Sequence, residues 1–286
     1  MTSGELDALF REAVSAIDAG DREALEALLV AHPELVRERL VSPGRWLREQ
    51  LGNALDGFFE RPWLLWFVAE DPVRNGRLPP NVAALARTIV DAARRLGVPS
   101  LQEQLDSTLR LVAWSWIARE CGVQIALIDV LADAGAALDG NPDNALVNGN
   151  DEAAAHLVER GARLTLGTAL CLGRWEDVGR LLENAGVRDR QFAFVLAALN
   201  GRAEALRRIV PLGVELNAPS PDLYPHATAL HHAVWSGSLD AVRVLVDAGA
   251  DINRKDEAWQ GTPRNWAEHS ENEEIASYLR EREKTA

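Results

Sequence analysis

The hydrophobic positions of this chain recur with the spacing of amphipathic helices. The clearest case is residues 239–246, where the apolar side chains fall three and four residues apart, at Leu239, Val242, Leu245 and Val246. This spacing predicts a helix with one apolar face. A shorter apolar run, residues 229–235, precedes it and predicts a second helix. A helix pair of this kind cannot bury its apolar face alone, so the pattern predicts stacking on further copies.

Glycines mark the ends of this unit and reveal its repetition. Gly237 separates the two predicted helices, and Gly249 follows the second, where the left-handed backbone conformation favours glycine. The same arrangement occurs upstream at Gly201 and Gly213. Shortened copies begin at Gly122, Gly149 and Gly173, and another follows Gly20. The sequence therefore predicts an all-α array of about seven to eight helix–turn–helix units.

The residues of the regular unit carry a family resemblance. Thr228-Ala-Leu-His231-His-Ala233, followed by Gly237 and by Gly249-Ala-Asp-Ile-Asn253, resembles the ankyrin repeat, which opens with Thr-Pro-Leu-His-x-Ala and closes with Gly-Ala-Asp-Val-Asn. The chain also resembles uncharacterised bacterial ankyrin proteins. The resemblance implies an ankyrin-repeat solenoid, in which β-hairpins join successive helix pairs. Because the units that begin at Gly149 and Gly173 are short, the hairpins near Gly161 and Gly186 are predicted to be short or stunted.

We expect one ankyrin-repeat domain over residues 1–286. Its parts would be an N-terminal capping unit at 1–40, enlarged irregular units at 41–110, shortened repeats at 111–225, and a regular repeat with a C-terminal cap at 226–286. The cap is predicted because the last unit is polar, with Glu271 at a position where glycine is expected. The enlarged segment leaves two alternatives open. Residues 63–69 and 81–93 form one helix pair with a long loop between them, or the segment is a helical insertion outside the repeats.

The net charge of the chain limits the class of macromolecule that it can bind. The 286 residues include 30 Lys and Arg against 43 Asp and Glu, a net charge of −13. This balance disfavours nucleic acid and anionic membranes, which need a positive surface, and favours a basic protein as partner. We expect neither a secretory leader nor a membrane-spanning segment, and with only two cysteines, Cys121 and Cys171, we expect a cytoplasmic protein. The chain is also expected to be a monomer. Both cysteines are expected to be small buried hydrophobes.

Candidate catalytic chemistry is sparse. No phosphate-binding loop, nucleophile elbow or His-Glu-x-x-His motif occurs, so the chain is predicted not to be an enzyme and to need no cofactor. The alternative is an enzyme or small-ligand site in a pocket around Tyr224, His226, His231, His232 and Trp259. His231 occupies the position where the resemblance implies a hydrogen bond to the hairpin. Neighbouring helical side chains point about 100° apart, so His231 and His232 are not expected to share a metal ion.

The resemblance also implies which residues face a concave groove. These predicted partner-binding residues are Phe67, Leu196, Leu199, His232, Trp235, Ser236, Trp266 and His269. We expect Trp235 and Trp266 about 10 Å apart, the spacing of packed helices, with Asp251 and Asp256 as a negative rim. Six other tryptophans are expected to lie in the core: Trp46, Trp63, Trp66, Trp114, Trp116 and Trp175. The predicted function is non-catalytic protein binding through this groove, as an inhibitor or immunity partner of a basic protein.

Overall fold

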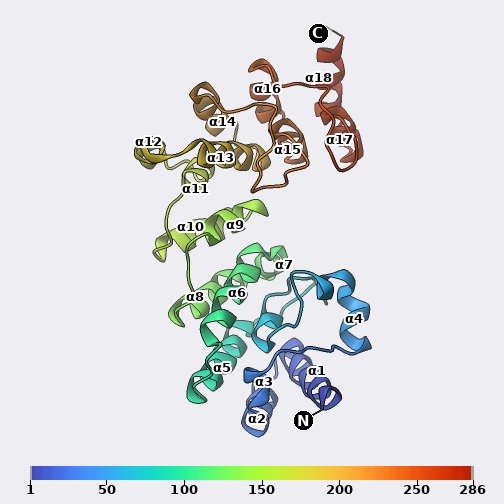
Figure 1. The fold of residues 1–286 in the computed structure, drawn as a ribbon, viewed down its shortest axis with the longest axis vertical. Helices are drawn as coiled ribbons and strands as arrows, with labels where there is room; N and C mark the ends of the chain where they lie inside the picture. Colours follow the sequence, from blue (N-terminus) through green and yellow to red (C-terminus); the bar gives the residue numbers. More distant parts are fainter. Residues whose placement is uncertain (1, 285–286) are drawn as a thin grey trace. The chain divides into compact units, whose positions relative to one another are not determined.

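The computed structural model describes residues 2–284, and these residues form helices joined by loops. Within them the single β feature is an isolated bridge between Ser220 and Leu223. The predicted all-α class is therefore confirmed. The chain divides into two compact units, Met1–Arg163 and Leu164–Ala286 (Figure 1). The sequence pattern predicts one continuous domain, and continuity across this boundary stays a prediction.

Unit 1 contains ten α-helices and two 3₁₀ helices among its described residues. They are α1 (Ser3–Ala19), α2 (Arg22–Ala31), α3 (Glu34–Arg37), α4 (Arg45–Leu51), η1 (Gly52–Asp56), η2 (Leu64–Val68), α5 (Val82–Arg95), α6 (Leu101–Trp114), α7 (Trp116–Glu120), α8 (Gln124–Asp133), α9 (Asn141–Val147) and α10 (Asp151–Glu159). Local sequence sets several of these ends. Thr2 and Glu5 form a reciprocal capping box at the start of α1, and Gly20 ends that helix in the left-handed conformation, with φ of 70°.

The helices of unit 1 pack as successive pairs. α1 packs on α2, η2 on α5, α6 on α8, and α9 on α10. The first members also contact one another in order, as do the second members, so each pair covers the apolar face of the pair before it. This is the stacking that the amphipathic pattern predicts, because a single pair leaves its apolar face uncovered.

Residues 41–80 depart from this regular pairing. The helix expected over residues 63–69 is reduced to η2, a five-residue 3₁₀ helix whose side chains are all buried. Tertiary packing rather than amphipathic periodicity therefore sets its backbone. The rings of Phe59 and Phe67 meet edge-to-face at 5.5 Å, and Phe59 lies 5.2 Å from Trp66. The second expected helix, over residues 81–93, is present as α5.

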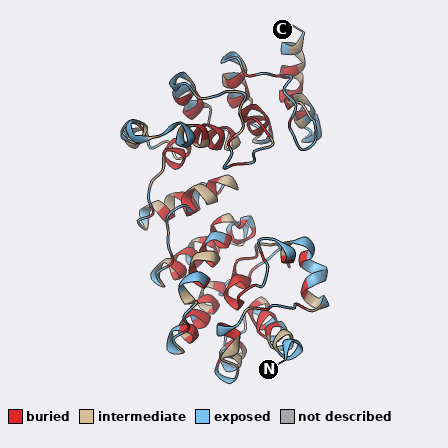
Figure 2. Ribbon diagram, in the orientation of Figure 1, coloured by how far each residue is buried: buried red, intermediate tan, exposed pale blue. Residues whose placement is uncertain are grey.

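Unit 2 contains eight α-helices and one 3₁₀ helix among its described residues. They are α11 (Leu166–Cys171), α12 (Trp175–Asn184), α13 (Val187–Leu199), α14 (Ala203–Ile209), η3 (Val210–Leu212), α15 (Ala229–Trp235), α16 (Leu239–Asp247), α17 (Pro263–His269) and α18 (Glu273–Glu283). They pair in sequence, and α11, α13, α15 and α17 pack side by side. Buried residues fill α11 and most of α15, whereas α16 and α18 combine buried positions with exposed ones (Figure 2).

Short polar caps and left-handed residues fix the register of unit 2. Ser238 caps α16, and Thr262 caps α17 in a capping box with Asn265. Gly237 has φ of 74° between α15 and α16, as its place in the sequence predicts. Glu271 adopts the same left-handed conformation between α17 and α18, with φ of 56°. The last pair therefore keeps the backbone of the repeat where the favoured glycine is missing.

The predicted shortening of the connections is confirmed. Among the described residues no strand flanks Gly161, and the segment from Ala162 to α11 is an extended loop. Around Gly186 the connection is shorter still, since α12 ends at Asn184 and α13 begins at Val187.

The tryptophans predicted to form the core divide into three groups. Trp63 and Trp66 are buried, as expected, and Trp46, Trp114 and Trp175 are half-buried. For Trp116 the prediction is wrong, because 41% of the residue is exposed. It is the first residue of α7, directly after the capping Ser115, where the helix starts at the surface.

Candidate functional site

Seven aromatic and imidazole side chains gather in unit 2, and we call this group the aromatic cluster. Its members come from the loop before α15, from α15, from the loop between α16 and α17, and from α17: Tyr224, His226, His231, His232, Trp235, Trp259 and Trp266. Residues predicted to bind a partner and residues predicted for the alternative ligand pocket thus lie in one place.

Trp266 of α17 lies at the centre of the aromatic cluster. Its ring centroid is 5.2 Å from that of His231, 5.6 Å from Trp259 and 6.3 Å from Trp235. The three ring pairs meet edge-to-face, the geometry that aromatic quadrupoles favour. The Trp235–Trp266 separation is shorter than the expected helix spacing of about 10 Å because the long indoles extend from α15 and α17 toward each other.

Three members of the aromatic cluster are exposed. The exposed fraction is 37% for Tyr224, 60% for Trp235 and 70% for Trp259, while Trp266 is half-buried beneath them. Single exposed apolar side chains are common on proteins, whereas contiguous ones mark interaction sites. The aromatic cluster therefore combines a packed interior with an accessible apolar surface.

His231 orders the repeat rather than presenting a reactive nitrogen. Its Nδ1 accepts the backbone N–H of Thr228 at 3.3 Å, so Nε2 carries the proton and donates it to the carbonyl of Gly261 at 3.2 Å. The Thr228 hydroxyl lies 2.8 Å from the same Nδ1. Burial lowers the pKa of His231, which keeps the imidazole neutral. Both ring nitrogens are thus used to tie the start of α15 to the start of α17.

His232 is buried within the aromatic cluster and does not reach the surface. Burial lowers its pKa to about 4, with smaller contributions from neighbouring His231 and His226. Its Nε2 atom has no hydrogen-bond partner in the described residues. The ring lies 5.8 Å from Tyr224 and 6.4 Å from Trp266, so it supports the exposed aromatic side chains from below.

A buried carboxylate holds the loop that carries Trp259. Asp256 Oδ1 accepts the backbone N–H groups of Ala258 at 2.9 Å and Trp259 at 2.7 Å. Its Oδ2 accepts the N–H of Gly261 at 2.8 Å and the indole N–H of Trp266 at 3.0 Å. Burial by itself raises the pKa of Asp256, but these hydrogen bonds outweigh it and the net shift is downward. Asp256 is therefore an anion that fixes both indoles.

The position of Asp256 overturns the expectation that this residue forms part of a negative rim. Asp256 is buried, so it cannot form the predicted negative rim; Asp251 is exposed. Its structural role was not predicted. The available signal was an aspartate in a loop, two and three residues before Ala258 and Trp259, since an aspartate commonly accepts backbone N–H groups a few residues later in a turn.

The predicted partner-binding residues do not all reach the surface. Phe67, Leu196 and His232 are buried, and their predicted exposure is wrong. The reason is that η2 and α13 are each enclosed by neighbouring helices, which cover the face assigned to the groove. The others retain surface in unit 2: Leu199, Ser236 and Trp266 are half-buried, and Trp235 and His269 are exposed. Partner binding by these five residues stays a prediction.

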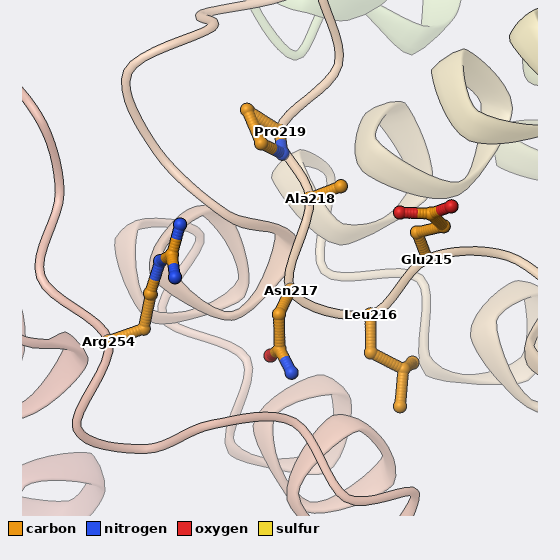
Figure 3. A pocket seen from close by; sticks show the side chains of 6 residues that line it. All are labelled: Glu215, Leu216, Asn217, Ala218, Pro219 and Arg254. Carbon is orange, nitrogen blue, oxygen red and sulfur yellow. The ribbon is translucent and has the colours of Figure 1, made fainter.

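An open hollow lies elsewhere in unit 2, between the loops that follow α14 and α16. Its volume is about 520 Å³, and it is lined by Glu215, Leu216, Asn217, Ala218, Pro219 and Arg254 (Figure 3). Glu215 and Arg254 lie on opposite sides of the backbone of residues 217–219, so their charges do not converge. The Asn217 side chain is already used, because its Oδ1 accepts the backbone N–H of Asp251 at 2.8 Å. The hollow shares no residue with the aromatic cluster.

Residues 2–284 contain neither a metal-binding cluster nor a membrane-spanning helix. No three His, Cys, Asp or Glu side chains in this range are placed to hold a metal ion together. No helix in the same range combines the length and apolar character needed to cross a bilayer.

Comparison with known proteins assigns the repeats. The family described as "Ankyrin repeats (3 copies)" matches residues 144–256. One curated relative, "Potassium channel AKT1" of Arabidopsis thaliana, is 34% identical over 87 residues. The match covers 30% of this chain and 10% of the channel, so the chain spans about a tenth of that relative's length.

The matched range and the described geometry agree. The matched range contains α13, α14, α15 and α16. These helices pair as the repeat predicts, and the capping threonine and left-handed glycines stand at the expected positions. Trp259 and Trp266 lie just beyond it, in the loop and helix that continue the stack. Ankyrin repeats generally serve as protein–protein interaction modules. The comparison therefore identifies ankyrin repeats within residues 144–256.

Proposed function

We propose that this chain binds a protein partner through the exposed part of the aromatic cluster. The observation that carries the proposal is the gathering of Tyr224, Trp235 and Trp259 around Trp266, all within ring-contact distance of at least one other member. Tryptophan and tyrosine are enriched among the residues that dominate binding energy at protein interfaces. Such anchors also lose little conformational entropy when a partner covers them.

The chemistry of the partner follows from charge. A net charge of −13 steers basic proteins toward the chain and repels acidic ones. We therefore propose a basic protein as partner, and binding that covers the partner's functional surface would make the chain its inhibitor. The aromatic cluster would supply the affinity, whereas the acidic surface would supply the association rate.

The alternative of catalysis at the same residues has less support. A general base needs a free nitrogen near a substrate, but both ring nitrogens of His231 are engaged within the repeat. His232 is buried with its pKa lowered to about 4, and the hollow of unit 2 lies at other residues. The arrangement supports binding rather than a reaction.

The proposal is tested by capture from a lysate of the source cells, with matched baits. The baits are the full chain, the Trp235→Ala/Trp259→Ala double variant, and Trp116→Ala, which removes an exposed tryptophan from unit 1 as a control. Proteins held by the first and third baits should be depleted on the second. Each lost anchor should weaken binding by on the order of 2 kcal/mol, about thirtyfold. Equal capture by all three baits would refute the proposal.

A check on folding accompanies the capture experiment. Truncating a buried tryptophan costs about 3–5 kcal/mol, and exposed ones cost less. Since Trp235 and Trp259 are mostly exposed, the double variant should retain the helical content of the wild-type chain, measured by circular dichroism. Loss of capture with retained helical content then reports on the interface alone.

A further inference from the structure

A buried negative charge, that of Asp256, lies against the aromatic cluster, and no cation within residues 2–284 forms an ion pair with it. Asp256 remains anionic because its hydrogen bonds lower its pKa, and all four donors are neutral N–H groups. Among the described residues, no basic side chain forms an ion pair with Asp256. The nearby His231 and His232 stay neutral, since burial lowers the pKa of both. An unneutralised carboxylate in a poorly solvated site attracts a cation to the surface above it.

The same carboxylate changes the character of the central indole. The indole N–H of Trp266 donates to Asp256 Oδ2 at 3.0 Å. A hydrogen bond to an anion polarises its donor, and this polarisation makes the face of the indole ring more negative. A ring with a more negative face attracts a cation more strongly. Trp235 and Trp259, which contact Trp266 and are mostly exposed, add accessible ring surface next to it.

Two tryptophans outside the aromatic cluster are each covered by an arginine side chain. The guanidinium of Arg39 lies 4.4 Å from the ring centroid of Trp63, and that of Arg208 lies 4.3 Å from Trp175. Within residues 2–284, by contrast, no arginine or lysine lies over an indole of the aromatic cluster. The cluster thus presents indoles that lack the cationic cover found elsewhere in the same protein.

We infer that the aromatic cluster seats an arginine side chain of the protein partner. The inference rests on the proposed function and names the chemistry of the anchor. Arginine fits better than lysine because its planar guanidinium stacks on an indole while its N–H groups remain free to donate. The charges on the neighbouring loop are mixed: Glu257 and Asp251 are acidic, whereas Arg254 and Lys255 are basic. The preference for a cation therefore depends on Asp256, which lies directly against the indoles.

The experiment uses short peptides and the indole N–H signals of the full ¹⁵N-labelled chain. The probe is Ac-Gly-Arg-Gly-NH₂; its neutral counterpart carries citrulline, which keeps the shape of arginine without its charge, and a third peptide carries lysine. The arginine peptide should shift the signals of Trp235, Trp259 and Trp266 and bind about fivefold more tightly than the citrulline peptide. It should also bind more tightly than the lysine peptide. The Trp175 signal serves as the internal control, because Arg208 already covers that ring.

Two variants locate the effect. Asp256→Asn keeps an acceptor for the Trp266 indole but removes the charge, so the arginine and citrulline peptides should bind it equally. If this variant does not fold, Trp259→Ala provides the second test, because Trp259 is exposed and its loss should weaken arginine binding several-fold.

The possible outcomes separate this inference from the proposed function. Equal binding of arginine and citrulline to the wild-type chain, tighter binding of lysine, or absence of shifts at the three indoles would each overturn the arginine seat. If capture still depended on Trp235 and Trp259 in that case, the interface would stand with an apolar anchor. If capture failed as well, the proposed function would fall independently.

Discussion

Removal of the buried cation in unit 1 should destabilise that unit strongly. Arg74 is 2% exposed at its side chain, and its guanidinium lies 3.3 Å from Glu70, whose side chain is fully buried. Glu70 Oε1 accepts the backbone N–H groups of Arg74, Asn75 and Gly76, but Oε2 has the ion pair alone. Arg74→Met therefore leaves a buried carboxylate without its cation, which typically costs about 3–5 kcal/mol.

Other contacts of Arg74 add less to this cost. The guanidinium also donates to both carboxylate oxygens of Asp18, at 2.9 and 3.0 Å, and to the carbonyl of Phe67 at 3.0 Å. The Asp18 side chain is 31% exposed, so water can replace its lost partner. The loss of unfolding free energy in Arg74→Met is thus set by the buried carboxylate of Glu70 rather than by the number of hydrogen bonds removed.

Hydrogen–deuterium exchange followed by mass spectrometry measures the effect unit by unit. In Arg74→Met, amides of α1 and α5 should exchange at least about a hundredfold faster, as expected for a loss of 3 kcal/mol or more. Amides of α15 and α16 in unit 2 provide the internal reference. Glu70→Gln added to Arg74→Met removes the orphaned charge but keeps the carbonyl oxygen for the loop. The double variant should therefore recover at least about 2 kcal/mol.

The reasoning would be refuted by either of two results. One is a change of less than 1 kcal/mol in unit 1 for Arg74→Met, which would mean that Glu70 finds solvent or a proton without penalty. The other is a double variant no more stable than the single one, which would place the cost in lost packing rather than in the buried charge.

Three further predictions concern pH and backbone conformation. Burial raises the pKa of Asp71 from 3.8 to about 6, so unit 1 loses stability as the pH rises through this range. Asp71→Asn should therefore stabilise unit 1 by about 3 kcal/mol at pH 8 and have no effect below pH 4. Denaturant unfolding at the two pH values measures this difference. Burial lowers the pKa of His232 to about 4. The stability that the neutral imidazole gives unit 2 is therefore complete above pH 6.5 and is lost as the pH falls toward 4. Amide exchange in α15 should accelerate across that interval. Glu271→Gly should stabilise the contact of α17 with α18 by about 1 kcal/mol, because Glu271 occupies the left-handed region, and an unchanged melting temperature would contradict this.

Unit 2 was predictable from sequence where local signals agree. Thr228 begins α15, Gly237 and Gly249 bracket α16, and the apolar positions between them set the buried face. Each signal acts within a few residues, so periodicity and capping suffice to find it. The exposure of Trp235 follows from the same register, since it lies at the end of α15 beyond the packed face.

Residues 41–80 could not be predicted because long-range contacts decide their conformation. Glu70 has a positive φ of 53° and is held by a loop that closes on its own carboxylate, while Arg74 reaches back to Asp18 of α1. Nothing in the local apolar pattern encodes such an ion pair. The buried state of Phe67 has the same origin, because its ring contacts that of Phe10 in α1 as well as that of Phe59.

The site was predicted in part for a related reason. Position within a repeat indicates which side chains face outward, but it does not indicate which loops fold back over them. Leu196 holds a groove position by sequence and is buried by its neighbours. Trp259 lies in a loop without periodicity, and its place beside Trp266 depends on Asp256, which lies outside the two motifs that carry the resemblance.

The construction of the aromatic cluster favours binding because its surface is ordered before a partner arrives. The backbone of Trp259 is fixed by Asp256, and its ring packs edge-to-face on His226 at 5.2 Å and on Trp266 at 5.6 Å. A flexible loop would have to lose conformational freedom on binding, typically about 0.5–1.5 kcal/mol for each side chain immobilised. Here hydrogen bonds and ring contacts already restrict the indoles in the free chain. The buried carboxylate that orders the loop is also the charge that favours a cationic anchor, so one residue serves both the shape of the surface and its selectivity.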